Sequence, residues 1–492
     1  MNPGLGATDS LIVVVYMLVV LLFGLWVGRG RKSSADYFLA NRSLPWGALL
    51  LSIVATETST VTFLSIPGIA AAAGGNLTFL QITFGYIAGR LFVVFVLLPL
   101  YFRGQAFTAY EVLESRFGQA SRRTVSTLFL LTRNAGDSLR LFLTALVLQL
   151  AVGIDLTTSI IALGGVTLVY TFIGGAKSVI WNDCVQFVIY IIGAVAAGVV
   201  MIDVIPGGFA QIIEAATADD RLRVLDFDTS LVKPSMTFWA GLAGGAFLTA
   251  ATHGTDQLMV QRYLSARRQA DAALALGLSG FIVLLQFALF LLLGIGLAVM
   301  HGATDDAHGL QADQLFASFL VNYLPTGLLG LALAAVFAAA MSTLSSSLNS
   351  SAAVFINDIY LPLRGEIVDQ AAQVRASRLA TILFGLLQTG LAVLYGWLGT
   401  GESTVANVLK ISGFATGPVL GLYLLGVFAP RVGQRSALAG FVIGVAILSS
   451  AALGTSVHWA WYALIGSLGT FMAGWLVQEM RERMVNIVGR QA

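Results

Sequence analysis

Residues 339–350 carry polar groups where an apolar segment would be expected to continue. They read AAMSTLSSSLNS and follow LLGLALAAVFA, which is almost pure hydrocarbon. At 3.6 residues per helical turn, one helical face collects the following residues, with Ser345 beside them: Ala339, Ser342, Thr343, Ser346 and Asn349. Small hydroxyl residues often only pack between helices. Hydroxyl and carbonyl oxygens also suit a hard cation such as Na⁺, so the stripe predicts either close packing or an ion site.

Ionisable residues interrupt several other apolar stretches. Six of them stand out: Glu57, Arg133, Asp137, Arg140, Asp183 and Lys410. An ionisable group in the bilayer core costs about 2.5–3.5 kcal/mol even on the lenient insertion scale, and such groups usually line a pathway. Groups near helix ends can instead reach water, an interpretation that stays open for Asp183 and Lys410. Asp137 is four residues from Arg133 and three from Arg140, so a helix brings the three together.

The composition indicates that these residues lie in a membrane. The 492 residues are 57% hydrophobic and 11% charged, with a mean hydropathy of +0.85. Soluble domains carry about 25% charged residues. A net charge of +2 gives no indication of a nucleic-acid partner, and a single cysteine, Cys184, excludes an intramolecular disulfide. The first apolar run, residues 11–27, lacks the flanks of a cleavable signal, so we expect a retained span.

Counting apolar runs of about 20 residues predicts 13 membrane spans. They lie near residues 10–28, 47–72, 77–102, 124–152, 156–174, 179–203, 236–255, 272–300, 325–350, 377–397, 403–429, 436–454 and 459–478. Alternate connections hold about 20 of the 27 Lys and Arg residues, and they include YFRGQAFTAYEVLESRFGQASRR, QRYLSARR and LRGEIVDQAAQVRASR. The opposite set holds about three and includes the two longest connections, near 204–235 and 301–324. Because cytoplasmic loops carry the Lys/Arg excess, the N-terminus is predicted outside and the C-terminus inside. The outer connection that ends near residue 324 contains a possible short amphipathic helix, QADQLFASFLVNYL.

Two spans show signs of irregular backbone. The second contains Pro67 and Gly68 after a Thr/Ser-rich stretch, and the seventh reads GLAGGAFLTAATHGTDQ, with four glycines. These two spans are five positions apart. Paired interruptions in matching spans point to a transporter built from inverted repeats, with its site at the breaks.

Six motifs, in order and nearly end to end, resemble the sodium:solute symporter family, which includes sodium–glucose, sodium–proline and bacterial sialic acid transporters. They are DYFLANRSLPW, TAYEVLESRFG, YTFIGGAKSVIWNDCVQ, DQLMVQRYLSA, AAMSTLSSSLNS and GPVLGLYLLGVFAP. The resemblance implies an all-α integral membrane fold with a LeuT-type core of two inverted five-helix repeats. We therefore expect one transporter domain over residues 1–492. Its parts would be a leading helix (10–28), the two repeats (47–203 and 236–429), two trailing helices (436–478) and a cytoplasmic tail (479–492).

The resemblance also implies two sodium sites. The first would use backbone oxygens and two hydroxyls from Ala55, Thr58, Ala339, Ser342 and Thr343. The second, present in some members, would use Asp183, Ser342, Ser345 and Ser346. All these positions carry suitable residues here, so we expect Na⁺ as the coupling ion and two Na⁺ per cycle.

Substrate positions are implied by the likeness of ATETSTVTFLSIPG to the sialic acid transporters. The expected substrate residues are Glu57, Ser59, Thr62, Phe79, Thr83, Arg133, Asp137 and Arg140. The arginine that holds the sialic acid carboxylate in those relatives aligns with Gly136, and Arg133 and Arg140 lie one turn to either side. An arginine fork pairs bidentately with a carboxylate. A carboxylate-bearing solute such as a sugar acid, monocarboxylate or amino acid is therefore expected.

The predicted function is Na⁺-coupled symport of a small polar organic solute by alternating access. The serious alternative is a proton-coupled or ion-independent carrier on the same fold, in which Glu57 titrates in place of one Na⁺. A membrane enzyme is disfavoured because the sequence shows no metal-binding pattern, nucleophile–base pair or phosphate loop. The expected partners are the solute, Na⁺ and the lipid bilayer, without nucleic acid or an obligate protein partner. The expected location is a bacterial inner membrane.

Overall fold

Within the residues that it describes, the computed structural model consists of helices and the segments that connect them, with one isolated bridge between Leu44 and Ala266. Those residues are 5–29, 33–104, 106–233, 236–303, 312–364, 369–398 and 404–491. The longer helices are α1 (Ala7–Val27), α3 (Trp46–Glu57), α4 (Thr60–Ala71), α5 (Ile82–Phe92), α8 (Gln119–Val152), α9 (Leu156–Val204), α11 (Gly245–Thr255), α12 (Gln257–Leu264), α13 (Gln269–Ala303), α15 (Leu328–Val354), α17 (Gln370–Leu398), α18 (Thr404–Phe428), α19 (Gln434–Gly454) and α20 (Tyr462–Gln491).

The number of spans is only partly established. Within the described residues, nine helices are long and apolar enough to cross a membrane, and the bent pair α3 and α4 makes a tenth. Three further predicted runs form α8, the first part of α9, and α11 with the preceding π-helical turn η4 (Ala240–Gly244). They do not meet the same length and hydropathy criterion. Thirteen spans therefore stay a prediction.

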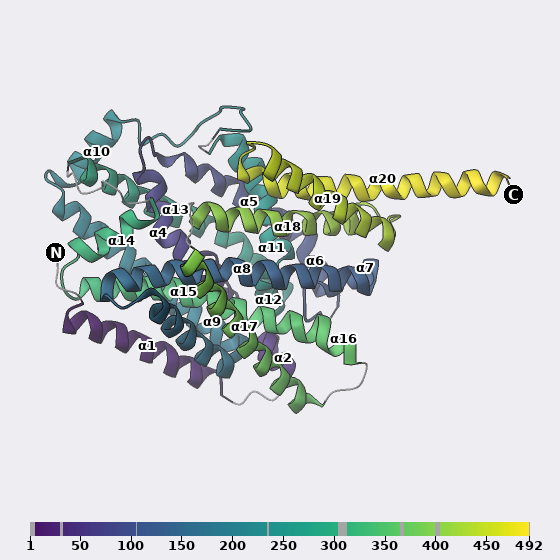
Figure 1. Ribbon diagram of the computed structural model, residues 1–492, viewed down its shortest axis with the longest axis horizontal. Helices are drawn as coiled ribbons and strands as arrows, with labels where there is room; N and C mark the ends of the chain where they lie inside the picture. The colour runs from purple at the N-terminus through teal and green to yellow at the C-terminus, as the bar shows by residue number, and fades with distance from the viewer. Residues whose placement is uncertain are drawn as a thin grey trace.

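The connections separate into two ends of the molecule (Figure 1). Helices α10 (Gly208–Ala218) and α14 (Ala312–Tyr323) lie at the end that holds the N-terminus. Both come from the connections that the charge pattern placed on the Lys/Arg-poor side, and α14 is the predicted amphipathic helix. Helices α7 (Glu111–Phe117) and α16 (Leu361–Arg364), both from basic connections, lie at the opposite end with the C-terminus.

Helix α15 is the centre of the bundle. Of its 27 residues, 25 are buried, and it packs against α9, α8, α1 and α3. Its first turn is capped from another helix, because Asp9 of α1 accepts hydrogen bonds from the backbone N–H groups of Gly327 (2.7 Å) and Gly330 (2.8 Å). The polar stripe of the sequence thus lies on a fully enclosed helix.

Both predicted interruptions exist, but not where glycine and proline indicated. Helix α3 ends at Glu57 and α4 begins at Thr60, with a 59° bend between them, whereas Pro67 lies inside α4. The second break falls at Asp256, which has extended backbone between α11 and α12. Placing the first break at Pro67 and Gly68 was wrong. The glycines of the seventh span instead allow close packing, since a Cβ on Gly241 would lie 2.7 Å from the carbonyl carbon of Gln81. The approach is close from both sides, because a Cβ on Gly85 of α5 would lie 2.2 Å from the carbonyl oxygen of Gly241.

The fifth and sixth predicted spans meet at Gly175 within α9. This glycine has non-helical backbone with a positive φ of 56°, so α9 consists of two helical segments joined at a kink, and the second segment, Gly175–Val204, matches the sixth predicted span. A Cβ there would lie 2.5 Å from the Tyr37 carbonyl oxygen, so glycine is required for both reasons. Helix α20 continues to Gln491, through most of the predicted tail, and projects from the bundle (Figure 1).

Candidate functional site

The break between α3 and α4 frees backbone carbonyl groups in the middle of the bundle. Thr58 and Ser59 leave the helical region of φ/ψ space. The Ser59 N–H donates to Glu57 O (3.1 Å) rather than to Ala55 O four residues back. An unpaired carbonyl inside a membrane protein needs another partner, and a cation is one such partner.

The α15 stripe faces this break. The Thr343 hydroxyl donates to Thr56 O (3.1 Å) and Ala339 O (3.4 Å), so it joins α15 to the last turn of α3. The predicted first sodium site, from Ala55, Thr58, Ala339, Ser342 and Thr343, therefore combines two helices that are in contact. Hydroxyl and carbonyl oxygens are the donors that fit Na⁺.

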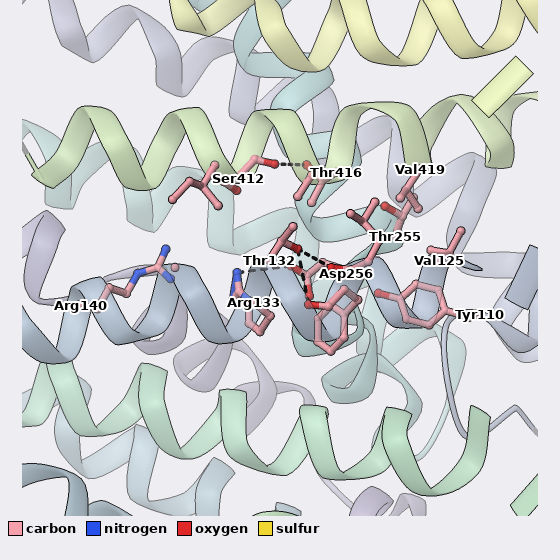
Figure 2. A pocket seen from close by; sticks show the side chains of 15 residues that line it. Tyr110, Val125, Thr132, Arg133, Arg140, Thr255, Asp256, Ser412, Thr416 and Val419 are labelled. Atoms are coloured by element: carbon pink, nitrogen blue, oxygen red, sulfur yellow. Dashed lines mark hydrogen bonds and ion pairs between the residues drawn. The ribbon is translucent and has the colours of Figure 1, made fainter. Parts of the chain in front are cut away.

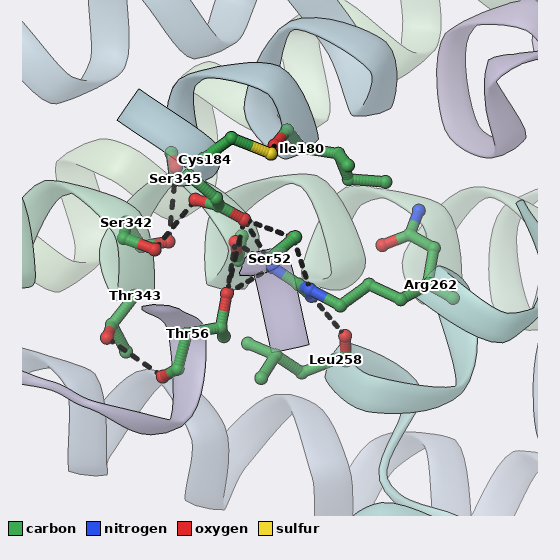
Figure 3. A network of polar contacts seen from close by, with 12 residues as sticks. Ser52, Thr56, Ile180, Cys184, Leu258, Arg262, Ser342, Thr343 and Ser345 are labelled. Atoms are coloured by element: carbon green, nitrogen blue, oxygen red, sulfur yellow. Dashed lines mark hydrogen bonds and ion pairs between the residues drawn. The ribbon is translucent and has the colours of Figure 1, made fainter. Parts of the chain in front are cut away.

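The Asp183 carboxylate of α9 is fully buried and contacts the same stripe. Figure 3 shows Ser52, Thr56 and Ser342 gathered in one polar network. The carboxylate accepts hydrogen bonds from Ser342 of α15 (2.7 Å) and Ser52 of α3 (2.5 Å). Ser345 donates to Ser342 O (3.2 Å), one turn away. These residues bring together α9 and α15, the two helices that the expected second sodium site requires, and Ser52 adds α3 to the cluster.

A guanidinium that the sequence did not single out also enters this cluster. Arg262 of α12 donates to Asp183 (3.0 Å), Ser52 (2.9 Å) and Ser346 (2.5 Å), and also to Thr56. Its side chain is almost completely buried. It lies in the quoted motif DQLMVQRYLSA, where we interpreted the arginine only as part of a basic connection. An arginine two turns after a helix break was the signal that could have identified it.

A cavity with about 120 Å³ of space for water-sized molecules adjoins the break. Its walls come from α3, α4, α5, α8, α11, α12, α13, α15, α18 and the 3-10 turn at Leu77–Gln81, and they include Thr56, Glu57, Thr62, Phe79, Arg133, Arg140, His253, Asp256 and Thr343. Thr56 and Thr343 also belong to the hydroxyl and carbonyl cluster described above. A solute in the cavity would therefore share groups with a Na⁺ ion at the break.

The α8 wall of the cavity carries two arginines. Arg140 pairs with Asp137, and Arg133 lies 3.6 Å from Asp137 and 3.5 Å from Asp256 at the second break. A smaller cavity of about 30 Å³ shares Arg133, Arg140 and Asp256 (Figure 2). In that view the Arg133 and Asp256 side chains point toward each other, so their ion pair lies where the two cavities meet.

Glu57 also lines the cavity and has two partners, namely Arg90, which does not line the cavity, and His253, which does and lies 3.5 Å from Glu57. Arg90 of α5, which is fully buried, donates to Glu57 and lies 3.3 Å from His253. The Glu57 side chain is 15% exposed, and this exposed part faces the cavity. The cavity lining carries two acidic groups, Glu57 and Asp256, and two arginines, Arg133 and Arg140. Arg90 and Asp137 pair with these groups without lining the cavity. Sequence reasoning missed Arg90 and His253, because neither belongs to a recognisable motif.

Comparison with known proteins decides the family. The profile of the sodium:solute symporter family matches residues 37–444. The sodium/sialic acid symporter SiaT of Proteus mirabilis is 28% identical over 95% of this chain and 94% of its own length. Sodium-coupled monocarboxylate transporter 2 of Mus musculus is 29% identical over 87% of this chain and 69% of its own length.

A solved structure gives the same answer. It is described as the substrate-bound outward-open state of a Na⁺-coupled sialic acid symporter, and it aligns with a TM-score of 0.89 and 27% identity. The alignment covers 96% of this chain and 98% of that one. This chain belongs to the sodium:solute symporter family. It is a Na⁺-coupled solute transporter, not an enzyme.

The symporter brings most, but not all, of the expected substrate residues to the cavity. Five line it: Glu57, Thr62, Phe79, Arg133 and Arg140. Three do not: Ser59, Thr83 and Asp137. The Thr83 hydroxyl is buried and donates to Leu80 O (2.7 Å), whereas Asp137 holds the arginines from behind. The Lys410 side chain lies outside the described residues.

Proposed function

We propose that this symporter carries a small polar solute bearing a carboxylate. The observation that supports this most directly is Arg140, which lines the cavity with its Nε unsatisfied by any described hydrogen-bond acceptor. Arg133 lies seven residues before it, two helical turns away, and lines the same cavity. Guanidinium groups at the wall of a largely apolar cavity favour an anionic group of the solute.

Glu57 narrows the chemical class of the solute further. It presents a carboxylate to the same cavity as the arginines, while Arg90, which does not line the cavity, balances its charge. A carboxylate accepts hydrogen bonds, so it favours a hydroxyl or ammonium group on another part of the solute. Sugar acids, hydroxy acids and amino acids have this combination. The relatives named for sialic acid and monocarboxylates also handle carboxylates, which supports the same class.

We further propose the stoichiometry and topology that the resemblance implied. Two Na⁺ would bind per cycle, one at the α3–α4 break against α15 and one at Asp183. The chain would cross a bacterial inner membrane 13 times, with two inverted five-helix repeats and the C-terminus inside. The breaks at Thr58–Ser59 and at Asp256, in matching helices of the two repeats, support this arrangement.

Coupling would follow from shared residues. Na⁺ drives transport only if it binds one conformation better than another, and its effect on solute affinity is reciprocal. Thr56 and Thr343 lie both at the cavity wall and in the ion cluster. Each Na⁺ contributes about 2.3 kcal/mol per 100 mV and about 1.4 kcal/mol for a tenfold gradient. Two ions supply roughly 7 kcal/mol, or about 10⁵-fold accumulation of a neutral solute.

The test is uptake into proteoliposomes. A panel of hydroxy acids, amino acids and sugar acids, each with its neutral amide, would be measured with an inward Na⁺ gradient or with choline in its place, from pH 6 to 8. We expect uptake only in Na⁺ and only for an acid. Uptake of amides at the same rate would overturn the carboxylate proposal. Uptake in choline that follows a pH gradient would favour the alternative in which Glu57 carries a proton, although its pairing with Arg90 already neutralises that carboxylate.

A further inference from the structure

The Asp183 cluster contains a cation that belongs to the protein itself. Each nitrogen of the Arg262 guanidinium has a partner: Nε donates to Ser52, Nη1 to Leu258 O (2.6 Å), and Nη2 to Asp183, Ser346 and Thr56. The carboxylate is 0% exposed and the arginine 3%. A buried carboxylate needs a compensating charge, and here Arg262 provides it (Figure 3).

The same oxygens would be ligands of a second Na⁺. Of the four residues of the proposed second site, Asp183 and Ser346 accept hydrogen bonds from Arg262, and Ser342 donates to Asp183. Na⁺ and the guanidinium cannot both use Asp183 and Ser346 without bringing two positive charges together in a dry interior. Charge repulsion in such surroundings is strong.

Arg262 is also attached to a part of the molecule that is suited to move. It lies on α12, which follows the break at Asp256. Through this one side chain, α12 is joined to α3, α9 and α15. Asp256, Leu258 and Met259 of the same region line the cavity. Removing the guanidinium from Asp183 would therefore release the polar attachment of α12 beside the solute.

We propose that Arg262 is a tethered cation that occupies the Asp183 carboxylate when the second Na⁺ is absent, and that this Na⁺ binds by displacing it. The inference rests on the proposed second Na⁺ site and adds a residue that sets its affinity. The exchange keeps Asp183 compensated in both states. It converts arrival of the ion into release of α12 from α3, α9 and α15, which links ion occupancy to the helix that borders the solute.

Equilibrium binding of radioactive ²²Na⁺ to the purified full chain tests this proposal, with choline holding ionic strength constant. In Arg262→Gln the second Na⁺ site, at Asp183, should bind Na⁺ about tenfold to a hundredfold more tightly. This is the effect of removing a unit charge about 6 Å away at an effective dielectric constant of about 20. Arg262→Lys keeps the charge but loses the fork, so a smaller gain of about two- to fivefold is expected. Arg268→Gln removes a nearby exposed charge and should leave Na⁺ binding unchanged.

The outcomes separate this inference from the proposed function. A gain in Arg262→Gln that disappears in Asp183→Asn/Arg262→Gln supports the tethered cation, because a merely structural arginine would not tighten Na⁺ binding when removed. If Asp183→Asn weakens Na⁺ binding but Arg262→Gln does not strengthen it, the second site stands and the exchange is refuted. If neither variant changes Na⁺ binding, the second site itself fails. If Arg262→Gln does not fold, Arg262→Lys replaces it, and Na⁺ binding that is no tighter than in the wild type refutes the exchange.

Discussion

Thr343 shows how one hydroxyl can connect an ion site to a helix break. It reaches from the buried helix α15 to the carbonyl of Thr56 in the last turn of α3. Thr343→Ala removes the hydroxyl while keeping a small residue, so packing changes little. We expect the Na⁺ concentration for half-maximal uptake to rise about tenfold, the loss expected when one charge-assisted contact disappears.

The control for Thr343 lies on the same helix. Ser350 is also buried, but its hydroxyl bonds within α15, to Ser347 O (3.1 Å). Ser350→Ala should leave the Na⁺ dependence at the wild-type value. Equal Na⁺ dependence in Thr343→Ala and the wild type would remove Thr343 from the ion site.

Arg140 provides a second prediction at this scale. Arg140→Gln keeps hydrogen-bonding capacity but removes the fork and the charge. We expect KM for the acid substrate to rise at least about tenfold, while uptake of its amide changes little and Na⁺ half-saturation stays within about twofold. Uptake kinetics of the acid and of its amide, measured in parallel for the wild type and Arg140→Gln, check these expectations. An equal loss for both compounds would mean that Arg140 maintains the cavity's shape rather than recognising a carboxylate.

Individual residues also show what the sequence can reveal. Asp183 and the α15 hydroxyls were recognisable because a motif or a polar stripe surrounds them. Arg90, His253 and Arg262 were not singled out, although Arg262 lies in a quoted motif, because the partners that give each its role are more than 30 residues away in the sequence. A charge near a helix end is indistinguishable, in sequence, from one that reaches water.

At the scale of elements, local sequence placed one break wrongly for a physical reason. Proline and glycine are the usual markers of interruption, yet Pro67 lies within a helix whose neighbours bury it. The break occurs at Thr58 and Ser59, which any sequence rule would accept in a helix. What holds it open is tertiary: the Thr58 hydroxyl donates to Gln286 of α13 (2.9 Å), and the preceding turn receives Thr343.

The glycine contacts yield a prediction about helix packing. Gly85 and Gly277 are both interior helical glycines, but only a Cβ on Gly85 meets backbone, at 2.2 Å from Gly241 O, whereas nothing lies within 4 Å of a Cβ on Gly277. Gly85→Ala should therefore push α5 from η4 and lower the thermal unfolding midpoint by several degrees, an overpacking penalty of about 1–3 kcal/mol. Gly277→Ala should leave it unchanged or slightly raised, since alanine is the better helix former. Similar midpoints for the two variants would contradict the close α5–η4 approach.

For the whole molecule, composition and charge pattern predicted a helical membrane bundle and the grouping of its connections. Residues 204–235 and 301–324, poor in Lys and Arg, contain α10 and α14 at the N-terminal end, and basic connections contain α7 and α16 at the other (Figure 1). Which helices touch could not be derived this way. The central place of α15 depends on packing against many other helices, among them α9, α8, α1, α17 and α3. Hydropathy alone does not distinguish a central helix from a lipid-facing one.

The net charge moved per cycle tests stoichiometry and solute charge together. With two Na⁺ and a monoanion, one positive charge crosses per cycle. At −100 mV and equal Na⁺ on both sides, this gives about 2.3 kcal/mol and roughly fiftyfold accumulation. A zwitterion with two Na⁺ would give about 4.6 kcal/mol, or roughly 2,000-fold. Cotransport of one Na⁺ with a monoanion moves no net charge, so the membrane potential drives no accumulation.

Proteoliposomes clamped with a potassium gradient and valinomycin distinguish these cases without any Na⁺ gradient. We expect accumulation that appears at inside-negative potential, vanishes at zero potential and needs Na⁺ on both sides. Asp183→Asn should abolish it for a monoanion, because a single remaining Na⁺ carries no net charge with that solute, even if Na⁺-gradient-driven uptake survives. Potential-driven accumulation that is unaffected by Asp183→Asn would show that the second charge crosses at another place, and would move the second ion away from α9.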